Sequence, residues 1–250
     1  MLIDRVFAEA EPFLRERKIG EVYIGLTVIV VSLDNGAIGS TLVLLEEVLV
    51  SDPVAIDPDL IKNMKAADMA KWALNPHEHV VKRMLGIATM NACAYSQDLS
   101  NGKRVEASTY VDLKPSDTVG VIGWMRHLVQ VAEEKARQVY VFDNGEAEFV
   151  YPSEKQAELL PTCDVVFISG TAFINQTIDQ ILNNCQNARD IIITGPTTPM
   201  YPNAYRDTTV TIIAGGVWKK DDRENIFRKV SLNAGMSKLK AHFEKYSVRL

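Results

Sequence analysis

Short runs of apolar and β-branched residues recur through the second half of the chain, and they constrain its fold more than any other feature. Five such runs occur, at residues 119–122, 139–142, 165–169, 191–194 and 210–214. Helical patterns, such as those over residues 125–137 and 178–184, separate most of them. Because parallel strands need a long crossover, usually a helix, this alternation predicts a parallel, doubly wound sheet with both faces covered. We therefore expect an α/β domain over residues 111–250.

The first part of the chain lacks this alternation. A helical apolar pattern covers residues 2–14, and residues 21–48 hold two β-branched runs on either side of the turn signal Asp34-Asn35-Gly36. The pattern predicts a helix followed by a β-hairpin.

Two further helical patterns follow, at about residues 60–74 and 76–96. For the second helix the sequence predicts Asn75 as the N-cap, with Pro76 in the first turn and Glu78 completing a capping box. Helix, hairpin and helices predict a small α+β domain over residues 1–110.

Composition limits the class of protein. The 250 residues are 47% hydrophobic and carry a formal net charge of -5, which argues against a protein that coats nucleic acid. No apolar run reaches the ~18 residues of a transmembrane helix, and the N-terminus lacks the pattern of a signal peptide. The cysteines, Cys93, Cys163 and Cys185, are odd in number and widely spaced, which predicts reduced thiols in the cytoplasm. A homodimer is compatible with the sequence.

The carboxyl ends of the predicted strands are candidate ligand sites, because open parallel sheets bind ligands there. Gly123 follows the first strand and precedes a helix, so the backbone can approach a ligand closely. The pyrophosphate fingerprint G-x-G-x-x-G is absent. Asp143 follows the second strand, 20 residues after Gly123, at the offset where dinucleotide- and adenosyl-binding folds hold a ribose. The alternative is a turn built from Asp143, Asn144 and Gly145.

The third strand end carries hydroxyls and an amide. Ser169, Gly170, Thr171 and Asn175 lie between this strand and the next helix, for which Thr177 and Gln180 form a predicted capping pair. These side chains either face a ligand or serve the loop and the helix cap.

The fourth strand ends in a proline-rich corner, Gly195-Pro196-Thr197-Thr198-Pro199. Gly195 permits a sharp exit, and the prolines fix φ and stiffen the path. We expect Thr197 and Thr198 to form a rigid polar wall of a binding site. The alternative is a surface turn without a role.

The sequence has neither the C-x-x-C nor the H-E-x-x-H spacing of metal sites. His77 and His79 point in different directions on a helix because they are two residues apart. His127 follows Gly123 closely and can act as a metal ligand or as an acid and base near neutral pH, although a solvent-facing role is the alternative. Cys93 is a second candidate ligand, although free cysteines often pack in the core.

Four stretches together resemble a known family, the proteins called "putative heavy-metal chelatases", long a domain family of unknown function. They are LGIATMNA (85–92), VGVIGWM (119–125), VVFISGTAFINQTIDQIL (165–182) and ITGPTTPMYP (193–202). The resemblance spans nearly the whole chain. It implies an enolase-N-terminal-like domain followed by a Rossmann-like domain, with a ligand site in the cleft between them.

The resemblance also implies site residues and a function. The predicted ligand-binding residues are Asn91, Gly123, Trp124, Asp143, Gly170, Thr171, Asn175, Gly195, Pro196, Thr197 and Thr198. The implied function is chelation of a divalent heavy metal ion or a metal-bearing small molecule, with a role in tetrapyrrole or corrinoid metallation. This chain has Met125, Arg126 and His127 where the family often has an aromatic residue and prolines, so the role of that loop is open.

Two other functions stay open. One is an enzyme that uses a nucleotide or S-adenosylmethionine, with Asp143 on the ribose. The other is a non-catalytic sensor whose two domains close on a small ligand. No Ser-His-Asp pattern can be assembled, so whether the chain catalyses a reaction is also open.

Overall fold

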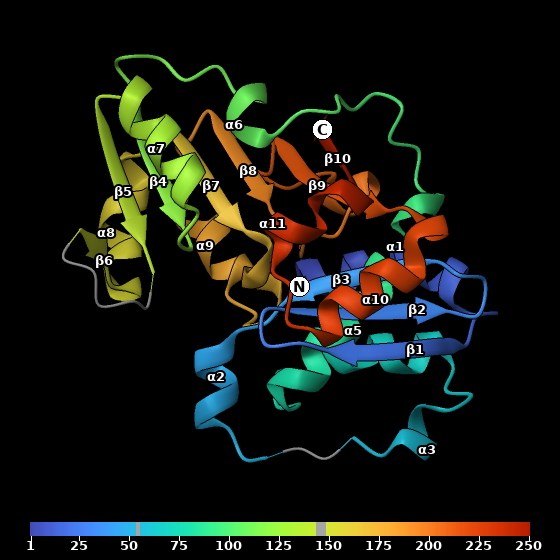
Figure 1. Ribbon diagram of the computed structural model, residues 1–250. Helices are drawn as coiled ribbons and strands as arrows, with labels where there is room; N and C mark the ends of the chain where they lie inside the picture. Colours follow the sequence, from blue (N-terminus) through green and yellow to red (C-terminus); the bar gives the residue numbers. More distant parts are fainter. Residues whose placement is uncertain (54–55, 144–148) are drawn as a thin grey trace.

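The computed structural model describes residues 1–53, 56–143 and 149–250 and contains two sheets (Figure 1). The first sheet has three antiparallel strands in the order β1-β2-β3. The second has seven strands in the order β10-β9-β8-β7-β4-β5-β6, and all its neighbours are parallel except β10 and β9. The predicted α/β class and the parallel arrangement are confirmed, with an antiparallel strand added at one edge.

The elements have the following bounds. The strands are β1 (Ile19–Ile24), β2 (Val28–Leu33), β3 (Ile38–Leu42), β4 (Thr118–Ile122), β5 (Gln138–Phe142), β6 (Val150–Tyr151), β7 (Val165–Ser169), β8 (Asp190–Thr194), β9 (Ile212–Trp218) and β10 (Phe243–Arg249). The α-helices are α1 (Leu2–Leu14), α2 (Leu45–Val50), α3 (Pro58–Ile61), α4 (Ala66–Ala70), α5 (Val80–Asn91), α6 (Ala107–Tyr110), α7 (Arg126–Lys135), α8 (Gln156–Leu159), α9 (Ile178–Asn184), α10 (Arg223–Ser231) and α11 (Met236–Leu239). Among the described helices, none is long and apolar enough to cross a membrane.

The predicted hairpin is confirmed as β2 and β3. Gly36 has φ +79° in the turn between them, and the Leu33 N–H donates to the Ala37 carbonyl at 2.9 Å. β1 was not predicted as a separate strand; it pairs with β2 on the other side. All six residues of β2 are buried, because α5 packs on one face of this sheet and α10, from far along the chain, packs on the other (Figure 1).

The helix predicted over residues 60–74 is broken into three pieces: α3, α4 and the 3-10 helix η1 (Lys71–Leu74). Asn63 has φ +67°, which ends the first piece. The backbone then pairs with the chain entering β1, since the Ile19 N–H donates to the Met64 carbonyl at 2.9 Å. A tertiary hydrogen bond therefore interrupts a sequence that favours helix.

The helix predicted over residues 76–96 begins later, at Val80, and its N-cap is His79 instead of Asn75. His79 Nδ1 accepts from the Val81 N–H at 3.1 Å. Asn75 Oδ1 instead accepts from the His77 N–H at 3.0 Å, which closes a turn before the helix. The helix ends at Asn91 and is followed by the 3-10 helix η2 (Ala94–Ser96).

The order of the second sheet determines where a ligand can bind. Taken along the chain, the parallel strands β6-β5-β4-β7-β8-β9 have the order 3-2-1-4-5-6 of the doubly wound dinucleotide-binding sheets. The order reverses between β4 and β7, so the connections that leave their carboxyl ends run in opposite directions and leave a crevice at this switch point. The last predicted strand, β9, spans residues 212–218 instead of the predicted 210–214. The edge strands β6 and β10 were not predicted.

Candidate functional site

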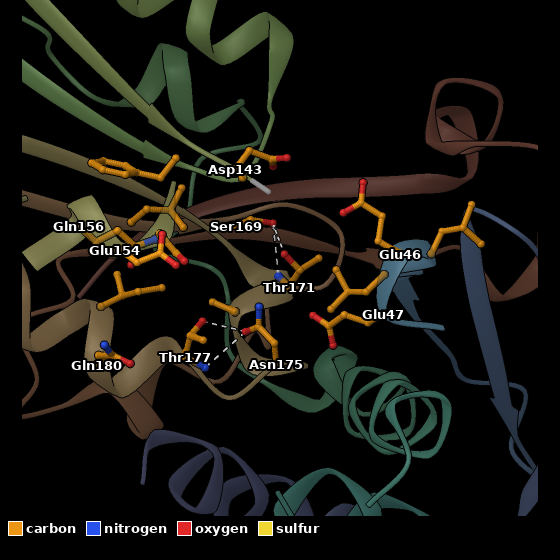
Figure 2. Close-up of a pocket in the computed structure, with 18 of the residues that line it drawn as sticks. Glu46, Glu47, Asp143, Glu154, Gln156, Ser169, Thr171, Asn175, Thr177 and Gln180 are labelled. Carbon is orange, nitrogen blue, oxygen red and sulfur yellow. Dashed lines mark hydrogen bonds between the residues drawn. The ribbon is translucent and has the colours of Figure 1, made fainter. Parts of the chain in front are cut away.

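A cavity of about 510 Å³ lies at the switch point of the second sheet, facing the segment that leaves β3 (Figure 2). Its floor is formed by the ends of β4, β5 and β7, and its opposite wall by residues 43–47. The lining residues are Val43, Leu44, Leu45, Glu46, Glu47, Ile122, Gly123, Phe142, Asp143, Ser153, Glu154, Gln156, Ser169, Thr171, Ala172, Asn175, Thr177, Gln180 and Ile181. The polar ones carry carboxylate, hydroxyl or amide groups.

Gly123 and Asp143 lie side by side in the lining of this cavity because β4 and β5 are parallel neighbours that end at the same level. The Trp124 N–H donates to Asp143 Oδ2 at 2.7 Å, and the Gly123 N–H donates to the Phe142 carbonyl at 2.8 Å. Gly123 has φ +90°, and a Cβ built there would lie 2.9 Å from Ser169 Cβ. The site therefore needs glycine at this position for both its conformation and its space. Asn144 and Gly145, the rest of the predicted turn, lie outside the described residues.

The loop after β7 contributes an ordered set of polar groups. Ser169 Oγ accepts from the Thr171 N–H at 3.3 Å and from the Thr171 hydroxyl at 2.8 Å. Asn175 Oδ1 accepts from the Thr177 hydroxyl at 2.7 Å (Figure 2). Thr177 occupies the N-cap position of α9, but its side chain makes no cap hydrogen bond, so the predicted capping pair with Gln180 is wrong. Both residues line the cavity instead.

The opposite wall carries two carboxylates, Glu46 and Glu47, at the start of α2. Figure 2 shows them on one side of the cavity and Glu154 on the other. Glu47 Oε2 lies 3.8 Å from Arg83 Nη2. Burial raises the pKa of Glu47 more than the Arg83 guanidinium lowers it. With Asp143, four carboxylates face the cavity, and its described lining contains no Lys, Arg or His.

Six predicted site residues lie outside this lining, at the seam between α5, β3 and the corner after β8. Thr197 Oγ1 accepts from the Leu42 N–H at 2.9 Å, and Asn91 Nδ2 donates to the carbonyls of Ser40 and Thr197 at 3.0 and 3.1 Å. Thr198 is buried beside Gly170, where an added Cβ would lie 2.5 Å from the Thr198 nitrogen. Gly195 has φ +112°, and Pro196 follows it half-buried. Of the predicted ligand-binding residues, the structure brings Gly123, Asp143, Thr171 and Asn175 together in the cavity.

The predicted metal ligands do not meet. His127 is exposed on α7, and Cys93 is fully buried in the core, where burial raises its pKa to about 12. His79 is engaged as a helix cap and His77 is exposed. Within the described ranges, no group of three or more His, Cys, Asp or Glu side chains is arranged to hold a metal ion.

Trp124 also lies outside the cavity. It is 42% exposed, and its ring centroid is 5.1 Å from that of Phe149. The pair faces a smaller surface depression with Arg126, Val129, Gln130 and Glu133. The Trp124 backbone thus holds Asp143, whereas its ring points elsewhere.

Sequence reasoning missed Glu46, Glu47 and Glu154. The two adjacent glutamates stand at the start of a six-residue helix with no buried residue, a pattern typical of a solvated surface. Glu154 follows β6, a strand of two residues that is too short to show a period. Their shared position appears only when the chain folds.

Comparisons with known proteins agree on the family. A family model (DUF364) described as "Putative heavy-metal chelation" matches residues 106–249, and a second (DUF4213) with the same description matches residues 7–94. An uncharacterised protein of Methanocaldococcus jannaschii is 30% identical over 141 residues, which are 54% of each chain, so the match spans about half of that curated relative.

Two crystal structures of DUF364 proteins of unknown function share the fold. The protein from Pyrococcus horikoshii has a TM-score of 0.86 at 24% identity, with all of both chains covered. The protein from Desulfitobacterium hafniense has a TM-score of 0.80 at 20% identity, covering 100% of this chain and 98% of that one. The matched family models together extend from residue 7 to residue 249, and the chain belongs to the DUF364/DUF4213 family described as "Putative heavy-metal chelation".

Proposed function

We propose that this chain binds a positively charged small molecule, including one that carries a metal, in the cavity between residues 43–47 and the ends of β4, β5 and β7. One observation carries the proposal: the four carboxylates Glu46, Glu47, Asp143 and Glu154 face the cavity without a basic side chain in its described lining. Such a lining attracts cations and repels anions. The volume of about 510 Å³ also lies in the range of about 300–1,000 Å³ typical of organic ligands.

The donor atoms decide in which form a metal fits. Soft and borderline heavy metals prefer sulfur and imidazole ligands, whereas carboxylates and carbonyls suit harder ions. No Cys, His or Met lines the described cavity, so a bare heavy-metal ion does not fit these residues. A metal held by its own organic ligand fits the charge and the hydrogen-bonding groups of the wall when the whole complex is positively charged, a condition that a metallated tetrapyrrole or corrinoid meets when its own carboxylates are amidated or esterified.

We also propose an identity for each of the two domains and a boundary between them. The strand order supports a Rossmann-like second domain. The antiparallel first sheet with α5 on one face supports an enolase-N-terminal-like first domain. The proposed boundary near residue 110 falls between α6 and β4.

A nucleotide- or S-adenosylmethionine-using enzyme is the second candidate. The observation in its favour is the position of Asp143 at the end of β5, beside Gly123 at the end of β4. The sensor with closing domains is less well supported, because hydrogen bonds of Asn91 and Thr197 already join the seam.

Hexaamminecobalt(III) provides a test, because it is a metal-bearing cation whose coordination positions are filled. We expect it to raise the melting temperature of the full chain. The double variant Glu46→Gln/Glu154→Gln should lose this stabilisation, and Glu224→Gln, an exposed change on α10, should keep it. Equal stabilisation of the double variant would show that the cation binds elsewhere, and the proposal would be wrong.

A further inference from the structure

We infer that the organic ligand of this cavity is an adenosyl compound that carries a positive charge near its ribose, the class represented by S-adenosylmethionine. The inference rests on the proposed function, since it concerns the same cavity. It goes further by separating two kinds of ligand that the fold could hold, phosphate-bearing nucleotides and adenosyl sulfonium compounds.

The first step is the position of the backbone at the switch point. Gly123 ends β4 with φ +90° and has no side chain between the cavity and Ser169. In doubly wound sheets a glycine after the first strand lets the nucleotide lie directly against the backbone. The backbone at this point is therefore open to a ligand, at the place where such folds bind their nucleotide.

The second step is the acceptor for a ribose. Asp143 follows β5, 20 residues after Gly123, and lines the same cavity. An acidic residue at this place and offset hydrogen-bonds ribose hydroxyls in dinucleotide-binding sheets. The hydrogen bond of 2.7 Å from the Trp124 N–H orients the carboxylate without a ligand.

The third step excludes the phosphates. Dinucleotide sites place the pyrophosphate on a glycine-rich turn at a helix N-terminus. Here the turn lacks the second and third glycines of that fingerprint, and α7 begins only at Arg126, whose side chain belongs to the separate depression beside Trp124. Glu46 and Glu47 stand across the cavity. A pyrophosphate in this cavity would face carboxylates with no cation among the described lining residues to offset them.

The fourth step is the charge that the walls prefer. Glu46 and Glu154 line opposite sides of the space next to Asp143 (Figure 2). A sulfonium beside the ribose would lie between carboxylates, and the hydroxyl and amide groups of Thr171 and Asn175 can meet the polar end of the ligand. An adenosyl compound with a neutral thioether in place of the sulfonium would not gain this attraction to the carboxylates.

Isothermal titration of the full chain with S-adenosylmethionine, S-adenosylhomocysteine and ATP tests this inference. The first two differ in the sulfonium methyl group and its charge. We expect S-adenosylmethionine to bind about tenfold or more tightly than S-adenosylhomocysteine, the effect of one favourable charge contact. ATP should not bind at the same concentrations.

Single variants test separately the contact with the sulfonium charge and the contact with the ribose. Glu46→Gln and Glu154→Gln should weaken S-adenosylmethionine several-fold and leave S-adenosylhomocysteine nearly unchanged. Asp143→Asn, which keeps an acceptor for the Trp124 N–H, should weaken both. Glu224→Gln is the matched control, and unchanged melting temperatures without ligand show that each variant is folded.

The outcomes distinguish this inference from the proposed function. Equal affinity for the two adenosyl compounds, binding of ATP, or no binding of S-adenosylmethionine at millimolar concentration would overturn the inference. If hexaamminecobalt(III) still acts through Glu46 and Glu154 in that case, the proposed cation site stands. If the stabilisation by hexaamminecobalt(III) does not depend on Glu46 and Glu154, both the proposed function and this inference are wrong.

Discussion

At the scale of single residues, the two threonines of the corner after β8 have different environments. Thr197 is 1% exposed, and its hydroxyl oxygen accepts from the Leu42 N–H across the seam. Thr198 is 3% exposed, and its hydroxyl has no hydrogen-bond partner among the residues the structure describes. The proline-rich corner thus uses one threonine to join the two parts of the chain.

This difference predicts opposite results for two matched substitutions. Thr197→Val leaves the partly buried Leu42 N–H without its acceptor and should lower the free energy of unfolding by about 1 kcal/mol, the usual net value of one hydrogen bond. Thr198→Val keeps the shape and removes a hydroxyl without a partner, so its effect should stay within about 0.5 kcal/mol. Urea unfolding at neutral pH measures both. Equal losses for the two variants would contradict this account.

At the scale of elements, α5 is held at its N-terminus by an unusual cap. His79 accepts from the Val81 N–H through Nδ1, and its Nε2 lies 2.8 Å from the Asp52 carbonyl. The ring thereby ties the start of α5 to Asp52, just after α2, the helix whose first residues line the cavity.

The cap predicts that His79→Ala destabilises the protein by about 0.5–2 kcal/mol, the usual cost of losing an N-cap. Asn75→Ala, at the cap position that the sequence favours, should cost less, because Asn75 only closes an exposed turn. Thermal unfolding of the two variants compares them. A larger loss for Asn75→Ala would mean that the helix starts where the sequence pattern places it.

The amino ends of β4 and β8 are joined by an ion pair in which the carboxylate is buried and the arginine is partly exposed. Asp117 is 2% exposed and receives Arg189 Nη2 at 3.0 Å and the Lys114 N–H at 2.8 Å. The hydrogen bond from Arg189 is the main reason that the pKa of Asp117 is lowered. Because the folded state holds the ionised carboxylate, its contribution is present above the ordinary carboxyl pKa of about 4.

The pair therefore predicts a specific acid response. Asp117→Asn should lower the free energy of unfolding by about 1–3 kcal/mol at pH 7, and the difference from the wild type should shrink as the pH falls below about 4. Denaturant unfolding at pH 7 and pH 3 measures this change. Asp68→Asn, which removes an exposed pair with Lys71, is the control and should have little effect at either pH. A cost for Asp117→Asn that stays constant with pH would rule out the charge as its source.

At the scale of the whole molecule, one hydrophobic core runs through both parts of the chain. It joins residues of α1 and α5, such as Val6 and Leu85, to residues of the second sheet, such as Ile168 and Ile193. A further cluster packs α10 on the first sheet, so the C-terminal segment returns to cover the N-terminal one (Figure 1). Neither sheet is buried by its own part of the chain alone.

A shared core predicts one cooperative unfolding transition for the full chain, because neither part keeps its buried surface when the other unfolds. Scanning calorimetry should give a calorimetric enthalpy equal to the van't Hoff enthalpy. Circular dichroism and tryptophan fluorescence should report the same midpoint. Two resolved transitions would show that the two sheets are independent folding units.

Much of this architecture follows from local sequence. The β-branched runs predicted β4, β5, β7 and β8 to within a residue or so, because a buried parallel strand needs a continuous apolar run. The same strand ends pointed to Gly123, Asp143, Thr171 and Asn175, which the fold brings to one cavity. The edge strands were missed because β6 has two residues and β10, FEKYSVR, mixes charged and apolar residues, so neither shows such a run.

What the sequence by itself determined is the four central strands β4, β5, β7 and β8 and their parallel arrangement, since these depend on periodicity and on residues adjacent in the chain. The tertiary structure alone decided that Thr197 belongs to the seam, that His79 caps α5, and that Glu46 and Glu154 line opposite sides of the cavity that also contains Asp143. These are contacts between segments distant in sequence, and no local pattern records them. The charge of the cavity, and with it the kind of ligand we propose, is therefore a property of the fold.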